Sequence, residues 1–180
     1  MALKATIYRA EVAVSDIDRG YYASHSLTLA RHPSETEERL MIRLLAFAMH
    51  ADERLEFGRG LSSDDEPDLW RKEDNGEIAL WIDVGLPDER RLRRAAGRAR
   101  ALTLLVYGQR AADVWWRKNE AALARLSTLT VKLLPDDAVK SLAALASRAM
   151  KLQCTLQDGQ VSVSDATQYV VIEPVRLMQP

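Results

Sequence analysis

The sequence predicts a mixed α/β fold in which helices flank a single twisted sheet. Three observations indicate this. Residues 3–14 and 21–30 alternate roughly between apolar and polar side chains, with the period of two that strands show. Residues 35–50 carry their apolar side chains at helical spacing. Residues 102–108, LTLLVYG, are apolar without alternation, which is typical of a strand buried on both faces.

Length and composition indicate one globular domain over residues 1–180, with 47% hydrophobic and 28% charged residues. The overall net charge of -1 does not predict a polyanionic partner. Affinity for nucleic acid therefore requires a local basic patch. The lone cysteine, Cys154, excludes an internal disulfide and suits a reducing compartment. No apolar run approaches the roughly 18 residues of a membrane helix. We therefore expect a cytoplasmic protein that does not enter a membrane.

The other elements follow from turn residues and helix-start residues. Ser34 is the expected N-cap of the first helix, and Pro87 is expected in the first position of a second helix that runs to residue 101. Gly58 and Gly60 are expected to let the chain bend before the acidic loop SSDDE, residues 62–66. The remaining predicted elements are strands at 54–60, 67–73, 77–84, 127–134 and 168–174, helices at 111–126 and 135–150, and a hairpin at 151–163.

The segment EPDLWRKEDNGEIALWIDVG, residues 66–85, predicts a hairpin with a defined register. A two-residue type I′ turn centred on Asn75-Gly76 places Asp68 opposite Asp83. One strand face then carries five side chains: Asp68, Trp70, Lys72, Trp81 and Asp83. Two carboxylates this close destabilise each other unless a cation lies between them. The alternative remains open that both are strand-end carboxylates in water, because a one-residue slip would separate them.

The order helix, three strands, helix, strand over about residues 34–107 resembles the αβββαβ core of the PD-(D/E)xK, restriction-endonuclease-like fold. Pro67-Asp68 and Asp83 match the positions of that motif's two acids. More closely, the chain resembles the bacterial YaeQ family in HPSETEERLMIRLLAFA, EPDLW, WIDVGLPDERRLRRAAGRA and VWW. The resemblance implies a variant of the nuclease-like fold with extra N-terminal and C-terminal strands.

The resemblance also implies a site for Mg²⁺ or Mn²⁺ formed by Glu38, Asp68 and Asp83. The alternative for Glu38 is a solvated carboxylate that complements the helix dipole, as Glu35 and Glu37 are expected to be. The motif is incomplete, because Gly85 stands where the nuclease pattern has a lysine that stabilises charge on the phosphate. Lys72 or Arg94 could supply the missing cation.

Three other groups of side chains are candidates for contact with a substrate. Arg90, Arg94 and Arg98 form one helical stripe suited to phosphate oxygens, with Arg91 and Arg93 at its flank. The alternative is a solvated face partly paired with Asp88, Glu89 and the acidic loop. Trp70 and Trp81 would wall the pocket beside the two aspartates. The pair at 115–116 offers either core packing, which the pattern favours, or a surface on which bases stack.

These residues suggest a divalent-metal-dependent nuclease as the leading hypothesis, with Asp68, Asp83, Lys72 and Arg94 as the catalytic groups. The alternative is a catalytically inactive nucleic-acid- or protein-binding module, connected with transcription. A small-molecule enzyme that uses the tryptophan-lined pocket is a third hypothesis. Nucleic acid is the expected partner, and the sequence indicates neither a protein partner nor an oligomeric state.

Overall fold

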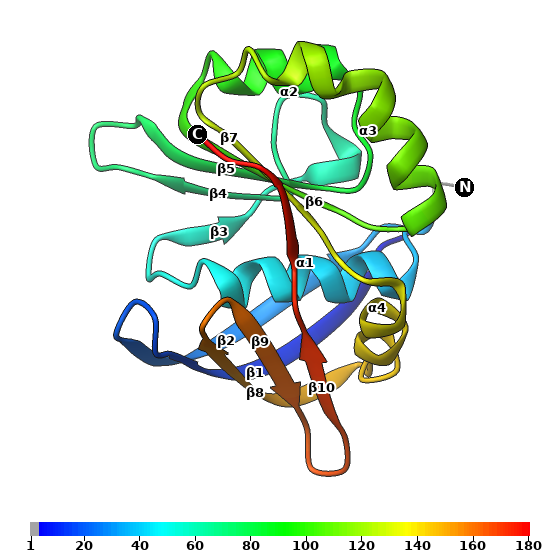
Figure 1. The fold of residues 1–180 in the computed structure, drawn as a ribbon. Helices are drawn as coiled ribbons and strands as arrows, with labels where there is room; N and C mark the ends of the chain where they lie inside the picture. Colours follow the sequence, from blue (N-terminus) through cyan, green and yellow to red (C-terminus); the bar gives the residue numbers. More distant parts are fainter. Residues whose placement is uncertain (1–3) are drawn as a thin grey trace. The chain divides into compact units, whose positions relative to one another are not determined.

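A computed structural model describes residues 4–180, which form four α-helices, one short 3-10 helix and eleven strands (Figure 1). The fold is mixed α/β, as predicted, but the expectation of a single sheet is wrong, because the strands form two mixed sheets. The chain divides into two compact units. The first comprises residues 4–51 and 137–173, and the second comprises Asp52–Asp136 and Pro174–Pro180.

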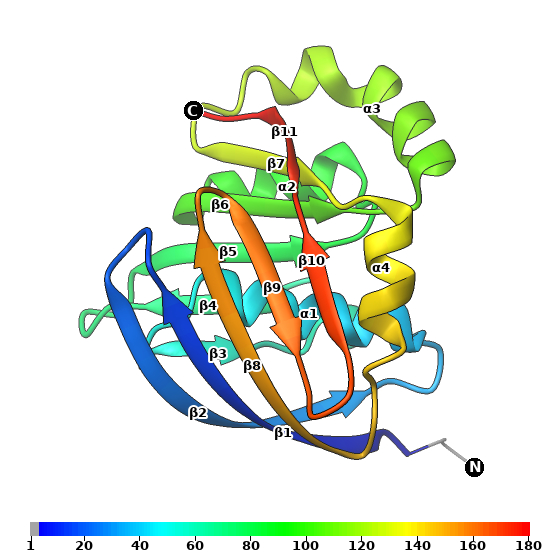
Figure 2. The ribbon, with the colours of Figure 1, turned by 60° about the horizontal axis from the view of Figure 1, so that its bottom comes forward.

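The sheet of the first unit has five strands in the order β10-β9-β8-β1-β2 (Figure 2). β1 (Thr6–Asp16) and β2 (Tyr21–Arg31) form an antiparallel hairpin. β8 (Ala149–Gln157) pairs with β1 in parallel, and β9 (Gln160–Ser164) and β10 (Tyr169–Ile172) continue the sheet in antiparallel order. The predicted strands at both ends of the sequence are therefore present, but they pair with each other in a sheet of their own.

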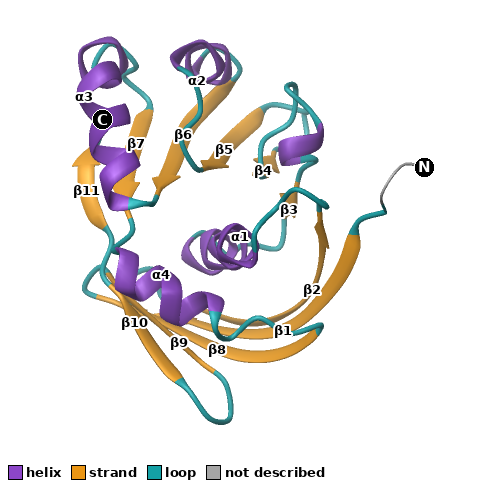
Figure 3. Ribbon diagram, turned by 90° about the vertical axis from the view of Figure 1, so that its right-hand side faces the viewer, coloured by secondary structure: helices purple, strands orange, loops and turns teal. Residues whose placement is uncertain are grey.

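Two helices, α1 (Glu37–Met49) and α4 (Asp136–Ala143), lie on the inner face of this curved sheet (Figure 3). The N-cap of α1 is Thr36, whose side chain accepts a hydrogen bond from the Arg39 backbone N–H at 3.1 Å, so the expectation of Ser34 is wrong. α4 ends well before residue 150, because the chain there enters β8.

A buried ion-pair network joins the start of α1 to the end of β2. Glu35 is only 3% exposed, and its carboxylate accepts two hydrogen bonds from the Arg43 guanidinium at 2.8 Å each. Arg39 donates a third at 2.9 Å, and Arg43 also donates to the Ala30 carbonyl at 3.0 Å. The expectation of a solvated Glu35 is therefore wrong. The sequence shows a carboxylate near the start of a helix, but it does not show that two arginine side chains bind this carboxylate.

The sheet of the second unit has six strands in the order β11-β7-β6-β5-β4-β3. The strands are β3 (Leu55–Phe57), β4 (Leu69–Lys72), β5 (Ile78–Val84), β6 (Ala99–Val106), β7 (Leu129–Leu133) and β11 (Val175–Met178). β3, β4 and β5 are antiparallel, whereas β5, β6 and β7 are parallel. The order of elements from α1 to β6 agrees with the prediction, but β11 was not predicted.

The parallel strands of the second unit are connected by α2 (Glu89–Ala96) and α3 (Gln109–Leu123), which cover the same face of the sheet (Figure 3). α2 begins after Asp88, its N-cap, and ends at Ala96 because β6 begins at Ala99, so it is much shorter than predicted. The core beneath the two helices contains Trp81, Leu92, Leu102, Leu104 and Leu129, among others.

Candidate functional site: an acid pair held by an arginine

The predicted hairpin register is confirmed for Leu69 to Arg71, but Lys72 pairs with Ile78 and the turn that was expected to produce the register is wrong. Leu69 pairs with Ile82, and Trp70 pairs with Trp81, as predicted. The turn has three loop residues rather than two, since the Glu73 N–H bonds to the Glu77 carbonyl at 2.8 Å and Gly76 adopts a positive φ of 86°. A register shift after Arg71 then restores the predicted pairing.

Asp68 immediately precedes β4 and lies against a tight backbone segment. Its side chain is buried, and Oδ2 accepts a hydrogen bond from the Val84 N–H at 2.8 Å. On its other side lies Gly60, at which a Cβ atom would be 2.4 Å from Asp68 Oδ1. Gly58 approaches the neighbouring Pro67 carbonyl in the same way. The two glycines were expected to let the loop bend. The structure shows that the absence of a Cβ also lets the loop backbone pack closely against Pro67 and Asp68.

Asp83, near the end of β5, is buried and binds a guanidinium group with both oxygens. Arg91 Nε donates to Oδ2 at 2.9 Å, and Nη2 donates to Oδ1 at 3.1 Å. Such a two-point contact is among the stronger polar interactions in proteins. The hairpin therefore places Asp68 and Asp83 together, as predicted, and Arg91 from α2 supplies the positive charge beside them.

The guanidinium of Arg91 also reaches the acidic loop. It donates to three backbone carbonyls, those of Ser63 at 3.5 Å, Asp64 at 3.4 Å and Glu66 at 3.0 Å. Burial by itself lowers the pKa of Arg91, but the hydrogen bond to Asp83 and the charges of Asp83 and Asp68 outweigh this, so the pKa is raised above its ordinary value. Arg91 is therefore a permanent cation in this position.

This arrangement does not fit a divalent ion held by Asp68 and Asp83 while Arg91 keeps its place. Both oxygens of Asp83 and one of Asp68 accept the hydrogen bonds described above, and the second oxygen of Asp68 faces Gly60. Glu38, the third predicted ligand, lies half-buried on α1, in the first unit. Within residues 4–180, no group of three His, Cys, Asp or Glu side chains could hold a metal ion.

The two tryptophans of the hairpin pack edge to face, with ring centroids 6.1 Å apart. Trp81 is only 2% exposed and belongs to the core beneath α2, so it does not face solvent as the wall of an open pocket. Each ring carries a cation: Lys72 Nζ lies 3.7 Å from the centroid of Trp70, and the Arg98 guanidinium carbon lies 5.1 Å from that of Trp81. The contact that the structure gives Lys72 is therefore with Trp70.

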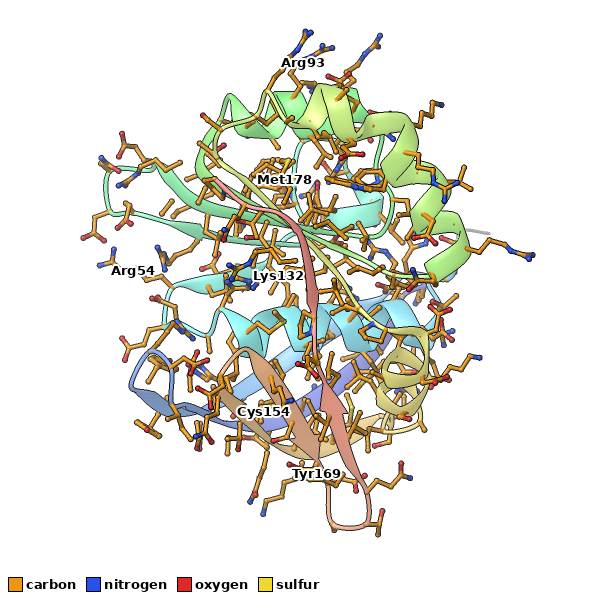
Figure 4. The ribbon with its side chains drawn as sticks, in the orientation of Figure 1. Arg54, Arg93, Lys132, Cys154, Tyr169 and Met178 are labelled. Carbon is orange, nitrogen blue, oxygen red and sulfur yellow. The ribbon has the colours of Figure 1, made fainter. Side chains whose placement is uncertain are left out.

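The predicted arginine stripe on α2 divides into paired and unpaired side chains. Arg94 bonds to the Asp65 carboxylate at 3.1 Å, and Arg98 bonds to the Asp65 carbonyl at 2.8 Å. Arg90 is exposed, and among the described residues it makes no side-chain hydrogen bond or ion pair. Arg93 projects outward from α2 (Figure 4), and its Nη1 lies 3.2 Å from Oε1 of Glu89. The alternative of pairing with the acidic loop is thus confirmed for Arg94 and Arg98.

Trp115 and Trp116 on α3 are half-buried and pack against the core of the second unit, as the pattern favoured. Trp115 Nε1 donates to the Pro87 carbonyl at 2.7 Å, which joins the middle of α3 to the start of α2. Arg117 and Lys118, which follow directly, are exposed and have no acidic partner among the described residues. This places further unpaired cations in the helix layer that carries Arg90.

Arg91 is the site residue that the sequence analysis missed, because it was assigned to the flank of the Arg90–Arg94–Arg98 stripe. A signal was present. Asp88 precedes Arg91 by three residues, and its carboxylate accepts a hydrogen bond from the Arg91 N–H at 2.8 Å as the N-cap of α2. Arg91 therefore lies in the first turn, at the helix end that adjoins Asp83.

A family model described as "YaeQ protein" matches residues 1–174. The chain belongs to the YaeQ family. The protein described as "Uncharacterized protein YaeQ" from Escherichia coli (strain K12) is 48% identical over 180 residues, which cover 100% of this chain and 99% of that protein. The protein of the same description from Salmonella typhi has the same identity and coverage.

Two solved YaeQ structures resemble this chain over almost its whole length. The crystal structure of the YaeQ protein from Xanthomonas axonopodis pv. citri matches with a TM-score of 0.94 and 52% identity, covering 98% of this chain and 99% of that one. The YaeQ protein from Pseudomonas syringae matches with a TM-score of 0.93 and 39% identity, covering 98% and 97%. No helix within residues 4–180 is long and apolar enough to span a membrane.

Proposed function

We propose that this YaeQ chain is a non-catalytic module that binds the phosphate backbone of nucleic acid through the exposed cations of α2 and α3. The observation that carries the proposal is the two-point contact between Arg91 and Asp83, which occupies the carboxylate that a metal-dependent reaction would need. Phosphate recognition then depends on arginine and lysine side chains and not on a bound metal ion.

The distribution of charge along the second unit supports this proposal. Residues 89–125 contain ten Arg and Lys against three Asp and Glu, a net charge of +7, although the whole chain has a net charge of -1. Residues 52–88 contain twelve acidic residues against four basic ones, a net charge of -8. Several arginines in and just after α2 bind the acidic loop. Arg90, Arg117 and Lys118, in contrast, have no acidic partner among the described residues.

The order α1, β3, β4, β5, α2, β6 supports the further proposal that the chain is a variant of the PD-(D/E)xK nuclease-like fold. In that fold, Asp68 and Asp83 would be the two acids of the motif, with Gly85 in the position of the lost lysine. A domain of this ancestry would retain its phosphate-binding surface after losing cleavage. The charged helix layer would then be the part of the ancestral site still in use.

Fluorescence anisotropy with labelled single-stranded and double-stranded DNA and RNA of about 20 nucleotides tests the proposal. We expect Arg90→Ala/Arg117→Ala to weaken binding at least tenfold at 0.1 M salt. It should also reduce the slope of log affinity against log salt by about two, since each lost phosphate contact removes roughly one counterion. Both side chains are exposed, so thermal unfolding should not change.

The matched control is Arg9→Ala/Lys140→Ala, which removes two exposed cations of the first unit and therefore changes the net charge equally. This control should bind like the wild type. Absence of binding to all four nucleic acids by the wild type, or equal losses in the two double variants, would refute the proposed interface.

The predicted nuclease remains a second candidate, because the hairpin brings two buried carboxylates together. It would require Arg91 to leave Asp83 so that Mg²⁺ or Mn²⁺ could bind, with Lys72 or Arg94 as the cation that replaces the motif lysine. Cleavage of the same oligonucleotides with either ion, abolished by Asp83→Asn, would favour this candidate. No cleavage by the wild type over a broad range of metal concentrations would eliminate it.

A further inference from the structure

Five oxygen atoms of the second unit converge on the guanidinium of Arg91. Two belong to the Asp83 carboxylate, and three are backbone carbonyls of the loop, those of Ser63, Asp64 and Glu66. Carboxylate and carbonyl oxygens are the ligands that hard divalent cations take in proteins. This set differs from a three-carboxylate site, since the loop backbone supplies most of its members.

The same oxygens cannot bind a guanidinium and a metal ion together. Arg91 contributes three nitrogen atoms to these contacts, and its first-turn position on α2 directs them to the end of β5. A second cation in this space would meet the charge of Arg91 at short range. It would also have to break the two-point contact with Asp83 before it could coordinate the carboxylate.

We propose that Arg91 is a built-in cation whose removal converts the oxygens of Asp83 and the loop at 63–66 into a site for a hard divalent ion. The guanidinium and the ion are alternative occupants of the same space. In the wild type, Arg91 excludes the ion and also ties α2, β5 and the loop together. This inference does not depend on nucleic-acid binding, which involves the exposed cations of α2 and α3.

Manganese(II) titrations of wild type and Arg91→Ala test the inference, with free Mn²⁺ counted by electron paramagnetic resonance. We expect Arg91→Ala to bind one Mn²⁺ per chain, at least tenfold more tightly than any binding by the wild type. Arg91→Ala/Asp83→Asn should lose this binding, because the variant lacks the carboxylate. Arg91→Lys should not bind Mn²⁺, because it restores a positive charge at the same position.

Thermal unfolding provides an independent readout, because an ion that binds only the folded protein raises the melting temperature. Mn²⁺ should raise the melting temperature of Arg91→Ala and leave those of the wild type and Arg91→Lys unchanged. Should Arg91→Ala not fold alone, Arg91→Gln, which retains the first three side-chain carbons and a polar end without the charge, is tested in the same two assays.

Three results would overturn the inference. One is a folded Arg91→Ala or Arg91→Gln that binds no Mn²⁺ at millimolar concentration. Another is wild-type binding as tight as that of the neutral variants, because Arg91 would then not exclude the ion. The third is binding by Arg91→Lys equal to that of Arg91→Ala, which would show that charge at this position is not the determinant.

Discussion

Replacing Glu35 with alanine should destabilise the protein strongly, by about 3–5 kcal/mol, because the substitution leaves the buried guanidinium of Arg43 without its counter-ion. Arg43 is only 6% exposed and donates two of its hydrogen bonds to Glu35. The three hydrogen bonds to the Glu35 carboxylate, counted at about 1.5–3 kcal/mol each, would give a larger total. They share partners and are not additive, so we take the lower range.

Urea denaturation followed by circular dichroism measures this loss. The matched control is Glu37→Ala, which removes an exposed carboxylate from the first turn of α1. This substitution should cost no more than about 0.5 kcal/mol. The double variant Glu35→Ala/Arg43→Leu should recover much of the stability, since it removes the uncompensated charge. A loss below about 1 kcal/mol for Glu35→Ala would refute the reasoning, because it would mean that the unpaired guanidinium of Arg43 carries no large cost in this position.

Two further predictions concern buried positions. Gly60→Ala should cost about 2–4 kcal/mol, because it combines a positive φ of 49° with a Cβ that would meet Asp68. Gly20→Ala has a positive φ of 67° and no atom within 4 Å, so it should cost only about 1 kcal/mol, and equal losses in urea denaturation would contradict the contact. Burial raises the pKa of the Cys154 thiol from 9.0 to about 12. The contribution of the buried neutral thiol to the stability of the fold is therefore complete below pH 9 and is lost as the pH rises toward 12. From pH 7 to pH 10 the wild type should therefore lose about 1.4 kcal/mol more than Cys154→Ala, and parallel pH profiles would contradict the shift.

Local patterns predicted the strands of the first unit and the hairpin of β8 and β9, but not the pairing of β1 with β8. The alternation in β1 marks one buried face, and Tyr8, Val12 and Val14 do lie in the core. Its parallel pairing with β8, however, joins Arg9 to Ala149 across most of the chain. No turn residue or hydrophobic period encodes a pairing at that separation. The prediction of one sheet therefore failed, although the strands themselves were predicted.

The prediction that Trp81 faces an open pocket was wrong, although the sequence contained the pattern that indicates its burial. The alternation in β5 was interpreted as one core face and one open face, which suits an edge hairpin. The run IALWIDV from Ile78 to Val84 is almost continuously apolar, a pattern typical of a strand within a parallel sheet. The structure buries every residue of β5 and pairs it in parallel with β6. Trp81 therefore packs beneath α2.

The hairpin shows why two carboxylates in a sequence predict a cation but not its identity. The register placed Asp68 next to the end of β5, and the repulsion between Asp68 and Asp83 was interpreted as a site for a metal ion, whereas the structure shows Arg91 bound to Asp83. A metal ion and a guanidinium both satisfy that electrostatic requirement. The choice depends on the connection between β5 and α2, which spans only residues 85–88, so the first turn of the helix returns to the end of the strand. Arg91 lies in that turn and Arg94 lies almost one turn further along, where it binds the acidic loop. The short connection thus brings the first-turn arginine to Asp83, where the guanidinium binds both carboxylate oxygens.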